Sequence, residues 1–117
     1  MSTERWLFAA LAFAAFMVLF RRLGGRKVSA ELVKQKIAAG AVIIDVRTAE
    51  EFRTGAYPGA INIPVQALAG RMPEIPKGIP IGVYGASGMR SASAATVLIC
   101  AGFPDVVNAG GLGSMPR

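Results

Sequence analysis

The chain has no histidine and only one cysteine, and these absences exclude several kinds of chemistry. Cys100 has no second cysteine with which to form a disulfide, and its free thiol agrees with a reducing compartment. Without histidine there is no Cys/His metal site, and a serine or cysteine nucleophile has no imidazole base. We therefore expect no metal site and no cofactor.

Polar side chains are absent from residues 6–20, which read WLFAALAFAAFMVLF. A helix that is apolar on every face favours lipid over water. At about 1.5 Å per residue the run covers about 22 Å of an apolar layer about 30 Å thick, so the flanking arginines would extend towards the interfaces. We expect one N-terminal transmembrane helix. A cleaved signal peptide and a buried core helix are the alternatives, and the small-residue cleavage site of a signal peptide is missing after Phe20.

The basic residues of the first 27 positions flank this apolar run and carry four of the six net positive charges. Most of them follow the run, as Arg21-Arg22 and Arg26-Lys27, so the positive-inside rule predicts a single-pass membrane protein with a cytoplasmic C-terminal domain. No basic stripe with interleaved aromatic residues appears further on, and we expect no nucleic-acid partner. We predict a membrane anchor with its basic flank over residues 1–27 and a folded domain over residues 28–117.

Residues 28–117 alternate between short apolar runs and helical segments. The runs 41–44, 60–63, 81–84 and 106–108 are typical of strands, and helices are expected at 30–39, 48–52, 65–71 and 91–101. The runs 41–44 and 81–84 lack alternation, which indicates strands buried on both faces. The fold class predicted is α/β, with an open, mostly parallel sheet flanked by helices.

Local signals mark several helix ends. Ser29 is a candidate N-cap, and Gly40 a left-handed terminator. Thr48 and Glu51 have the spacing of a capping box. In the helix 91–101 we expect a buried stripe at helical spacing, made of these residues: Ala94, Val97, Leu98 and Ala101.

A glycine-containing loop joins the strand 81–84 to the helix 91–101. Its residues are Gly85, Ala86, Ser87, Gly88, Met89 and Arg90, with Ser91 at the start of the helix. A strand, a glycine loop and a helix in this order form the usual geometry of an anion site, because backbone amides at a helix N-terminus point at the ligand.

Two long segments together resemble the rhodanese-like family over about Val28 to Gly111. They are IIDVRTAEEFRTGAYPGAINIP and VYGASGMRSASAATVLICAGFPDVVNAGG. The second is similar to the stretch that holds the family's active loop, Cys-x-x-Gly-x-Arg-Ser. The resemblance implies a loop cysteine that carries sulfur as a persulfide between a donor such as thiosulfate and an acceptor. Gly85 stands at the place of that cysteine, while Gly88, Arg90 and Ser91 keep the rest of the pattern.

Several residues have two interpretations. Asp45 and Arg47, which end a strand, are either a structural charge pair or supporting groups of the site. Arg90 either faces an anion or lies on solvated surface. Ser87 lacks a base that would make it a nucleophile. Cys100, about 15 Å further along the helix, is expected to serve packing.

The leading hypothesis is a membrane-anchored, non-catalytic rhodanese-like domain whose loop 85–91 binds a small oxyanion such as thiosulfate or sulfate, or a protein partner. An active sulfurtransferase that uses Cys100 or an external thiol is one alternative, and a structural membrane component is another. The resemblance also implies a further helix after Arg117. Without it we expect apolar sheet surface that a partner or a second copy, as in a homodimer, would cover.

Overall fold

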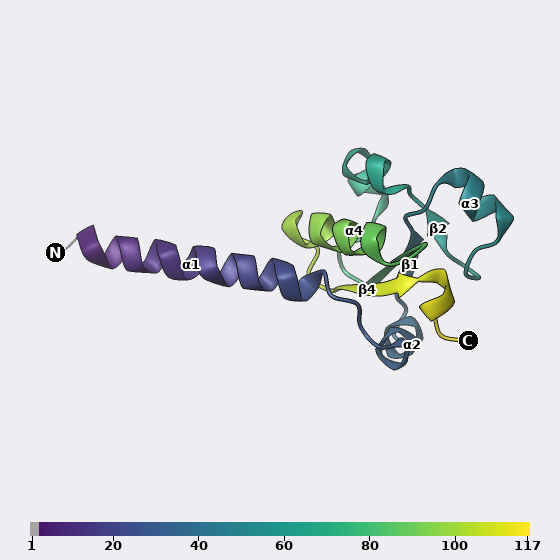
Figure 1. Cartoon of the computed structure of the whole chain (residues 1–117), viewed down its shortest axis with the longest axis horizontal. Helices are drawn as coiled ribbons and strands as arrows, with labels where there is room; N and C mark the ends of the chain where they lie inside the picture. The colour runs from purple at the N-terminus through teal and green to yellow at the C-terminus, as the bar shows by residue number, and fades with distance from the viewer. Residues whose placement is uncertain (1–2) are drawn as a thin grey trace.

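The computed structural model describes the backbone of residues 3–117, with the side chains of residues 5–16 and 25–117. A long N-terminal helix, α1 (Thr3–Gly24), extends away from an α/β domain (Figure 1). In the domain the elements follow in this order: α2 (Ala30–Ala38), β1 (Val42–Asp45), α3 (Ala49–Thr54), β2 (Ile61–Asn62), η1 (Val65–Glu74), β3 (Ile81–Gly85), α4 (Met89–Cys100), β4 (Val106–Gly111) and η2 (Leu112–Ser114).

The four strands form one sheet in the order β2-β1-β3-β4, and every neighbouring pair is parallel. This arrangement confirms the predicted α/β fold with a parallel sheet. Parallel strands need crossover connections, and here these are α3, η1 and α4. Because of the crossovers, the carboxyl ends of β1 and β3 lie side by side, with Asp45 paired to Tyr84 in the register.

Helices cover both faces of the sheet, which explains why the two central strands are continuously apolar. On one face α4 and η1 pack over Ile44 and Val83, and on the other α2 and η2 pack over Ile43 and Tyr84. Figure 1 shows α4 and α2 on opposite sides of the strands. The alternation of side chains along β1 and β3 therefore supplies two separate cores.

Several local predictions are confirmed. The Ser29 hydroxyl accepts from the Leu32 amide at 3.2 Å, and Gly40 has a φ of 92°. Thr48 and Glu51 form the capping box, with the Glu51 amide donating to Thr48 Oγ1 at 3.1 Å. These signals act within one turn, so the sequence is sufficient to predict them.

Two helical predictions need correction. The segment expected as an α-helix at 65–71 is a 3-10 helix that continues to Glu74 and contains Pro73, whose ring nitrogen has no hydrogen to donate to an α-helical bond. In α4, Val97 is 36% exposed and Ala101 is also exposed. The buried stripe consists of these residues: Ser91, Ala94, Ala95 and Leu98.

The apolar run 6–20 lies within α1, although the side chains of residues 17–20 are outside the described residues. Side chains described from this run, such as Trp6 and Phe8, are exposed. Among the residues that the structure describes, no helix is both long and apolar enough to cross a membrane. The predicted transmembrane helix is therefore not supported.

Candidate functional site

The loop predicted as the site connects β3 to α4 at the carboxyl edge of the sheet. β3 ends at Gly85 and α4 begins at Met89. Gly88 lies between them as the N-cap of α4, with a φ of 96° and no side chain that accepts from the first amides of the helix. A left-handed glycine thus turns the chain into α4 and leaves the amides at its head without a side-chain cap.

The loop is fixed by β4 and by the first turn of α4. A Cβ added at Gly111 would lie 2.6 Å from the Ala86 carbonyl oxygen, so a glycine in β4 lets the loop approach closely. The Ser91 hydroxyl lies 2.9 Å from the Gly88 carbonyl oxygen and 3.1 Å from that of Gly110. Ser91 is buried and joins the loop to β4, which gives it a structural task.

Gly85 is a buried strand residue without a positive φ, so an ordinary L residue fits its backbone. A Cβ built there would lie 3.4 Å from the Ser91 amide nitrogen and 3.4 Å from Arg90 Cβ. Both distances are ordinary contacts. A side chain at position 85 would therefore begin at the head of α4, where the helix dipole favours a negative charge.

The other loop residues face outward. Ala86, Ser87 and Met89 are exposed, and Met89 is 81% exposed. Cys100, the single cysteine, is also exposed, so the expectation that it serves packing is wrong. It ends α4, about 16 Å from Met89 at the usual rise per residue, and the structure does not bring it to the loop.

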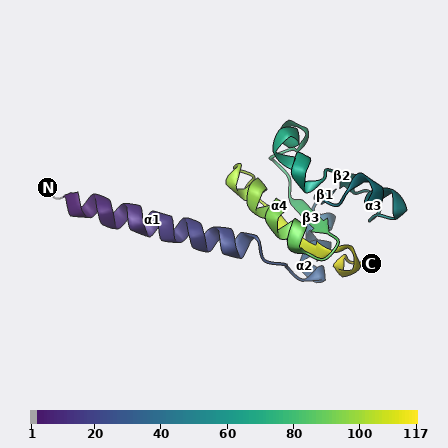
Figure 2. The same cartoon turned by 45° about the horizontal axis from the view of Figure 1, so that its top comes forward.

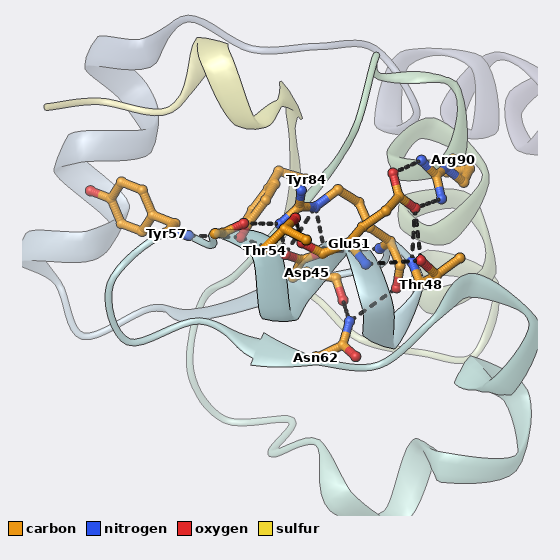
Figure 3. A network of polar contacts seen from close by, with 10 residues as sticks. Asp45, Thr48, Glu51, Thr54, Tyr57, Asn62, Tyr84 and Arg90 are labelled. Atoms are coloured by element: carbon orange, nitrogen blue, oxygen red, sulfur yellow. Dashed lines mark hydrogen bonds and ion pairs between the residues drawn. The ribbon is translucent and has the colours of Figure 1, made fainter.

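Arg90 is partly exposed and is paired with Glu51. Its Nη1 donates to Glu51 Oε1 at 2.7 Å and its Nη2 to Glu51 Oε2 at 3.0 Å (Figure 3). The Arg90 guanidinium, followed by the Thr48 amide, holds the pKa of Glu51 at about 2, and the same ion pair raises the pKa of Arg90. The sequence identified Glu51 as a cap of α3 but gave no signal of this contact across the sheet edge.

Asp45 and Arg47 form a buried ion pair just below the loop. Arg47 Nη2 lies 2.7 Å from Asp45 Oδ2, and Asp45 is completely buried. The hydrogen bonds that Arg47 donates to the Asp45 carboxylate raise the pKa of Arg47. Arg47 Nη2 also donates to the Gly55 carbonyl oxygen at 2.7 Å, which ties the end of α3 to β1. This geometry matches the structural charge pair that was one of the two interpretations.

Buried Tyr84 and partly buried Asn62 complete this cluster, and sequence reasoning missed both. The Tyr84 hydroxyl donates to Asp45 Oδ2 at 2.7 Å and accepts from the Tyr57 amide at 2.9 Å. Burial raises the pKa of Tyr84. Asn62 Nδ2 lies 3.0 Å from the carbonyl oxygens of both Asp45 and Arg47, joining β2 to β1. The cluster therefore fixes the strand ends from which the loop and α3 begin (Figure 3).

A pocket of about 490 Å³ lies between α2, the turn at Pro58 and the C-terminal segment. Its lining residues are Ile37, Tyr57, Pro58, Leu112, Gly113, Met115, Pro116 and Arg117. No residue of the loop 85–91 lines it, so the pocket and the loop are separate features.

Comparisons with known proteins agree with this geometry. The rhodanese-like domain family matches residues 29–113. A sulfurtransferase of Allochromatium vinosum is 32% identical over 84 residues, which cover 70% of this chain and 78% of that protein. A structure of a rhodanese with anions from E. coli has a TM-score of 0.61 at 35% identity, covering 65% of this chain and 94% of that one.

A structure of reduced CoADR-RHD from Bacillus anthracis has a TM-score of 0.67 at 32% identity, covering 75% of this chain. Only 16% of that longer chain is covered, so the likeness concerns one part of it. The match to the family extends from the N-cap of α2 to η2 and includes the whole sheet and the loop between β3 and α4. The chain therefore belongs to the rhodanese-like domain family.

Proposed function

We propose that this protein is a non-catalytic rhodanese-like module whose loop 85–91 binds a small tetrahedral oxyanion such as sulfate or thiosulfate. The observation that carries the proposal is the head of α4, where no side chain caps the first amides and position 85 has no side chain. Amides at a helix N-terminus attract anions, and the glycine leaves space in front of them.

Covalent sulfur transfer needs a thiolate, and the loop has no cysteine. The single thiol of the chain, on Cys100, is exposed at the opposite end of α4. The relatives named as a sulfurtransferase and as a rhodanese with anions support a loop that recognises sulfur oxyanions. In this proposal the loop binds the oxyanion, but no sulfur atom is transferred to the protein.

Isothermal titration calorimetry of the full chain with sulfate, thiosulfate and phosphate tests the binding. We expect saturable binding of sulfate and thiosulfate, and a loss of that binding in Arg90→Gln, which removes the cation of the loop. Arg53→Gln, which removes an exposed cation from the end of α3, is the matched control. The absence of saturable heat with all three anions rejects the proposal.

Mass spectrometry after incubation with thiosulfate, together with a thiosulfate-to-cyanide assay, tests the missing chemistry. We expect no added sulfur mass and no turnover in the native protein, and no change in Cys100→Ser. Gly85→Cys should gain the mass of one sulfur atom, because its Cβ has room beside the Ser91 amide. Turnover by the native protein that disappears in Cys100→Ser would support the alternative of an active sulfurtransferase.

We also propose that α1 attaches the module to a membrane, with the domain on the cytoplasmic side. Exposed side chains such as Trp6, Phe8, Leu11 and Phe13 support an apolar partner for this helix. The basic residues around Arg26 support contact with anionic lipid headgroups on that side.

A further inference from the structure

Arg90, the cation of the loop, already forms an ion pair with another residue of the protein. The Glu51 carboxylate accepts hydrogen bonds from both terminal nitrogens of Arg90, Nη1 and Nη2, in a bidentate ion pair. The two side chains are 36% and 33% exposed, so solvent and small ions reach the pair. Any oxyanion that needs the same fork of N–H groups must first displace the carboxylate.

Glu51 is held in this position from its other side. Its Oε1 accepts from the Thr48 amide and from the Thr48 hydroxyl, each at 3.1 Å (Figure 3). With a pKa of about 2, Glu51 is ionised at every pH at which the protein would function. The Arg90 guanidinium is therefore paired with a fixed negative charge at these pH values.

We propose that Glu51 is a selectivity residue of the loop, whose carboxylate competes with ligands for Arg90 and admits tetrahedral dianions while rejecting monovalent oxyanions. This inference rests on the proposed anion-binding function. Sulfate and thiosulfate carry two charges and can replace a carboxylate on the fork with a net gain. Nitrate offers the same fork of oxygens with one charge, and it has no such advantage.

The α3 helix need not be lost when the charge is removed. Glutamine at the third position of a capping box can make the same return contact to the N-cap amide. Glu51→Gln is therefore a substitution that keeps the cap of α3 and removes only the competing charge. Glu74→Gln is the matched control, because it removes the carboxylate of another exposed arginine pair, Arg71–Glu74, on η1.

The experiment is calorimetric titration of the full chain with sulfate and with nitrate at constant ionic strength. We expect sulfate to bind Glu51→Gln about three- to fivefold more tightly than it binds the native protein. This fold-change corresponds to the free energy that an exposed ion pair usually contributes. Nitrate binding should strengthen more, so that the ratio of sulfate to nitrate affinity falls in Glu51→Gln. Glu74→Gln should behave like the native protein.

The outcomes separate the two proposals. If the native protein binds sulfate and Glu51→Gln binds it equally or more weakly, Glu51 merely positions Arg90 and the selectivity role is overturned. An unchanged ratio of sulfate to nitrate affinity overturns it as well. If neither the native protein nor Glu51→Gln binds any anion, the proposed function itself fails. The native protein gives an independent measurement, because equal affinity for nitrate and sulfate contradicts the inference without any variant.

Discussion

A single hydroxyl group, that of Tyr84, joins three segments of the chain below the loop. It donates to the buried carboxylate of Asp45 and accepts from the Tyr57 amide, while the Arg47 guanidinium lies 5.7 Å from the centre of the Tyr84 ring. A buried ion pair stays favourable only when its remaining polar atoms are satisfied. Tyr84 provides one of those contacts, and it comes from the strand that continues into the loop.

We expect Tyr84→Phe to lower the free energy of unfolding by about 1–3 kcal/mol, because the buried Asp45 carboxylate and the Tyr57 amide each lose a partner. Urea unfolding followed by circular dichroism measures the change. Tyr57→Phe is the control, since only the backbone amide of Tyr57 takes part in the cluster. Equal loss of stability in both variants would contradict the role assigned to the Tyr84 hydroxyl.

The ion pair of Glu51 predicts a dependence of stability on pH. The pKa of Glu51 is lowered in the folded protein from 4.5 to about 2, so its contribution to stability is present above pH 4.5 and is lost as the pH falls towards 2. We expect Glu51→Gln to be less stable than the native protein at pH 7, with a difference that narrows between pH 4.5 and 2. Urea midpoints measured across this range test it.

Glu50→Gln, which removes a carboxylate from the same turn of α3, controls for the loss of one charge. A difference between Glu51→Gln and the native protein that stays constant from neutral to strongly acidic pH would show that the Arg90 contact does not stabilise the fold.

At the scale of single elements, α3 and α4 both begin where a central strand ends, but they are capped in different ways. α3 has the Thr48–Glu51 capping box, whereas α4 begins at a left-handed glycine without a side-chain cap. A capping side chain accepts a hydrogen bond from one of the first amides of α3, while the first amides of α4 have no side-chain cap. The difference in capping distinguishes the start of α4 from the start of α3.

We expect Gly88→Ala to lower the free energy of unfolding by about 1–2 kcal/mol, because an L side chain is strained at a positive φ. Steric contact is not the cause, since the nearest atom to an added Cβ is Gly110 Cα at 3.7 Å. Thermal unfolding measures the change. Gly113→Ala is the matched control, having no atom within 4 Å of its Cβ position and no positive φ, and it should be close to neutral.

At the scale of the whole molecule, α1 and the domain are joined by a short segment that pairs with the edge of the sheet. Asn108 Nδ2 donates to the Gly25 carbonyl oxygen at 2.7 Å, and the Val28 amide donates to the Asn108 carbonyl oxygen at 2.9 Å. These contacts hold the base of α1 beside β4, and α1 extends away from the domain (Figures 1 and 2).

Trp6 is the single tryptophan of the chain and is 81% exposed, so its fluorescence reports on the environment of α1 alone. We expect a blue shift of the Trp6 emission when vesicles containing anionic lipid are added to the full chain, because an apolar helix with a basic flank enters the lipid interface. The control is a double substitution in α1, Leu11→Lys with Phe13→Lys, which should remove the shift. An unchanged spectrum of the native protein would contradict membrane attachment.

The sequence by itself determined the order of strands and helices, the parallel α/β class, the caps at Ser29 and Thr48, and the position of the loop 85–91. Each of these depends on neighbouring residues or on one periodicity. The buried stripe of α4 was predicted only in part, because the side that α4 turns to the sheet depends on how the crossover packs. Val97 is an apolar residue whether it faces the sheet or the solvent, so its type does not identify the buried side of α4.

Only the tertiary structure decided which charges meet. Glu51 and Arg90 are 39 residues apart in the chain, as are Asp45 and Tyr84, and both pairs come together because β1 and β3 are parallel neighbours in register. A capping signal places Glu51 on α3 but says nothing of a guanidinium that arrives from another crossover. Local hydrogen bonding is encoded within a turn, whereas a contact across the sheet edge requires the strand order and register to be set first.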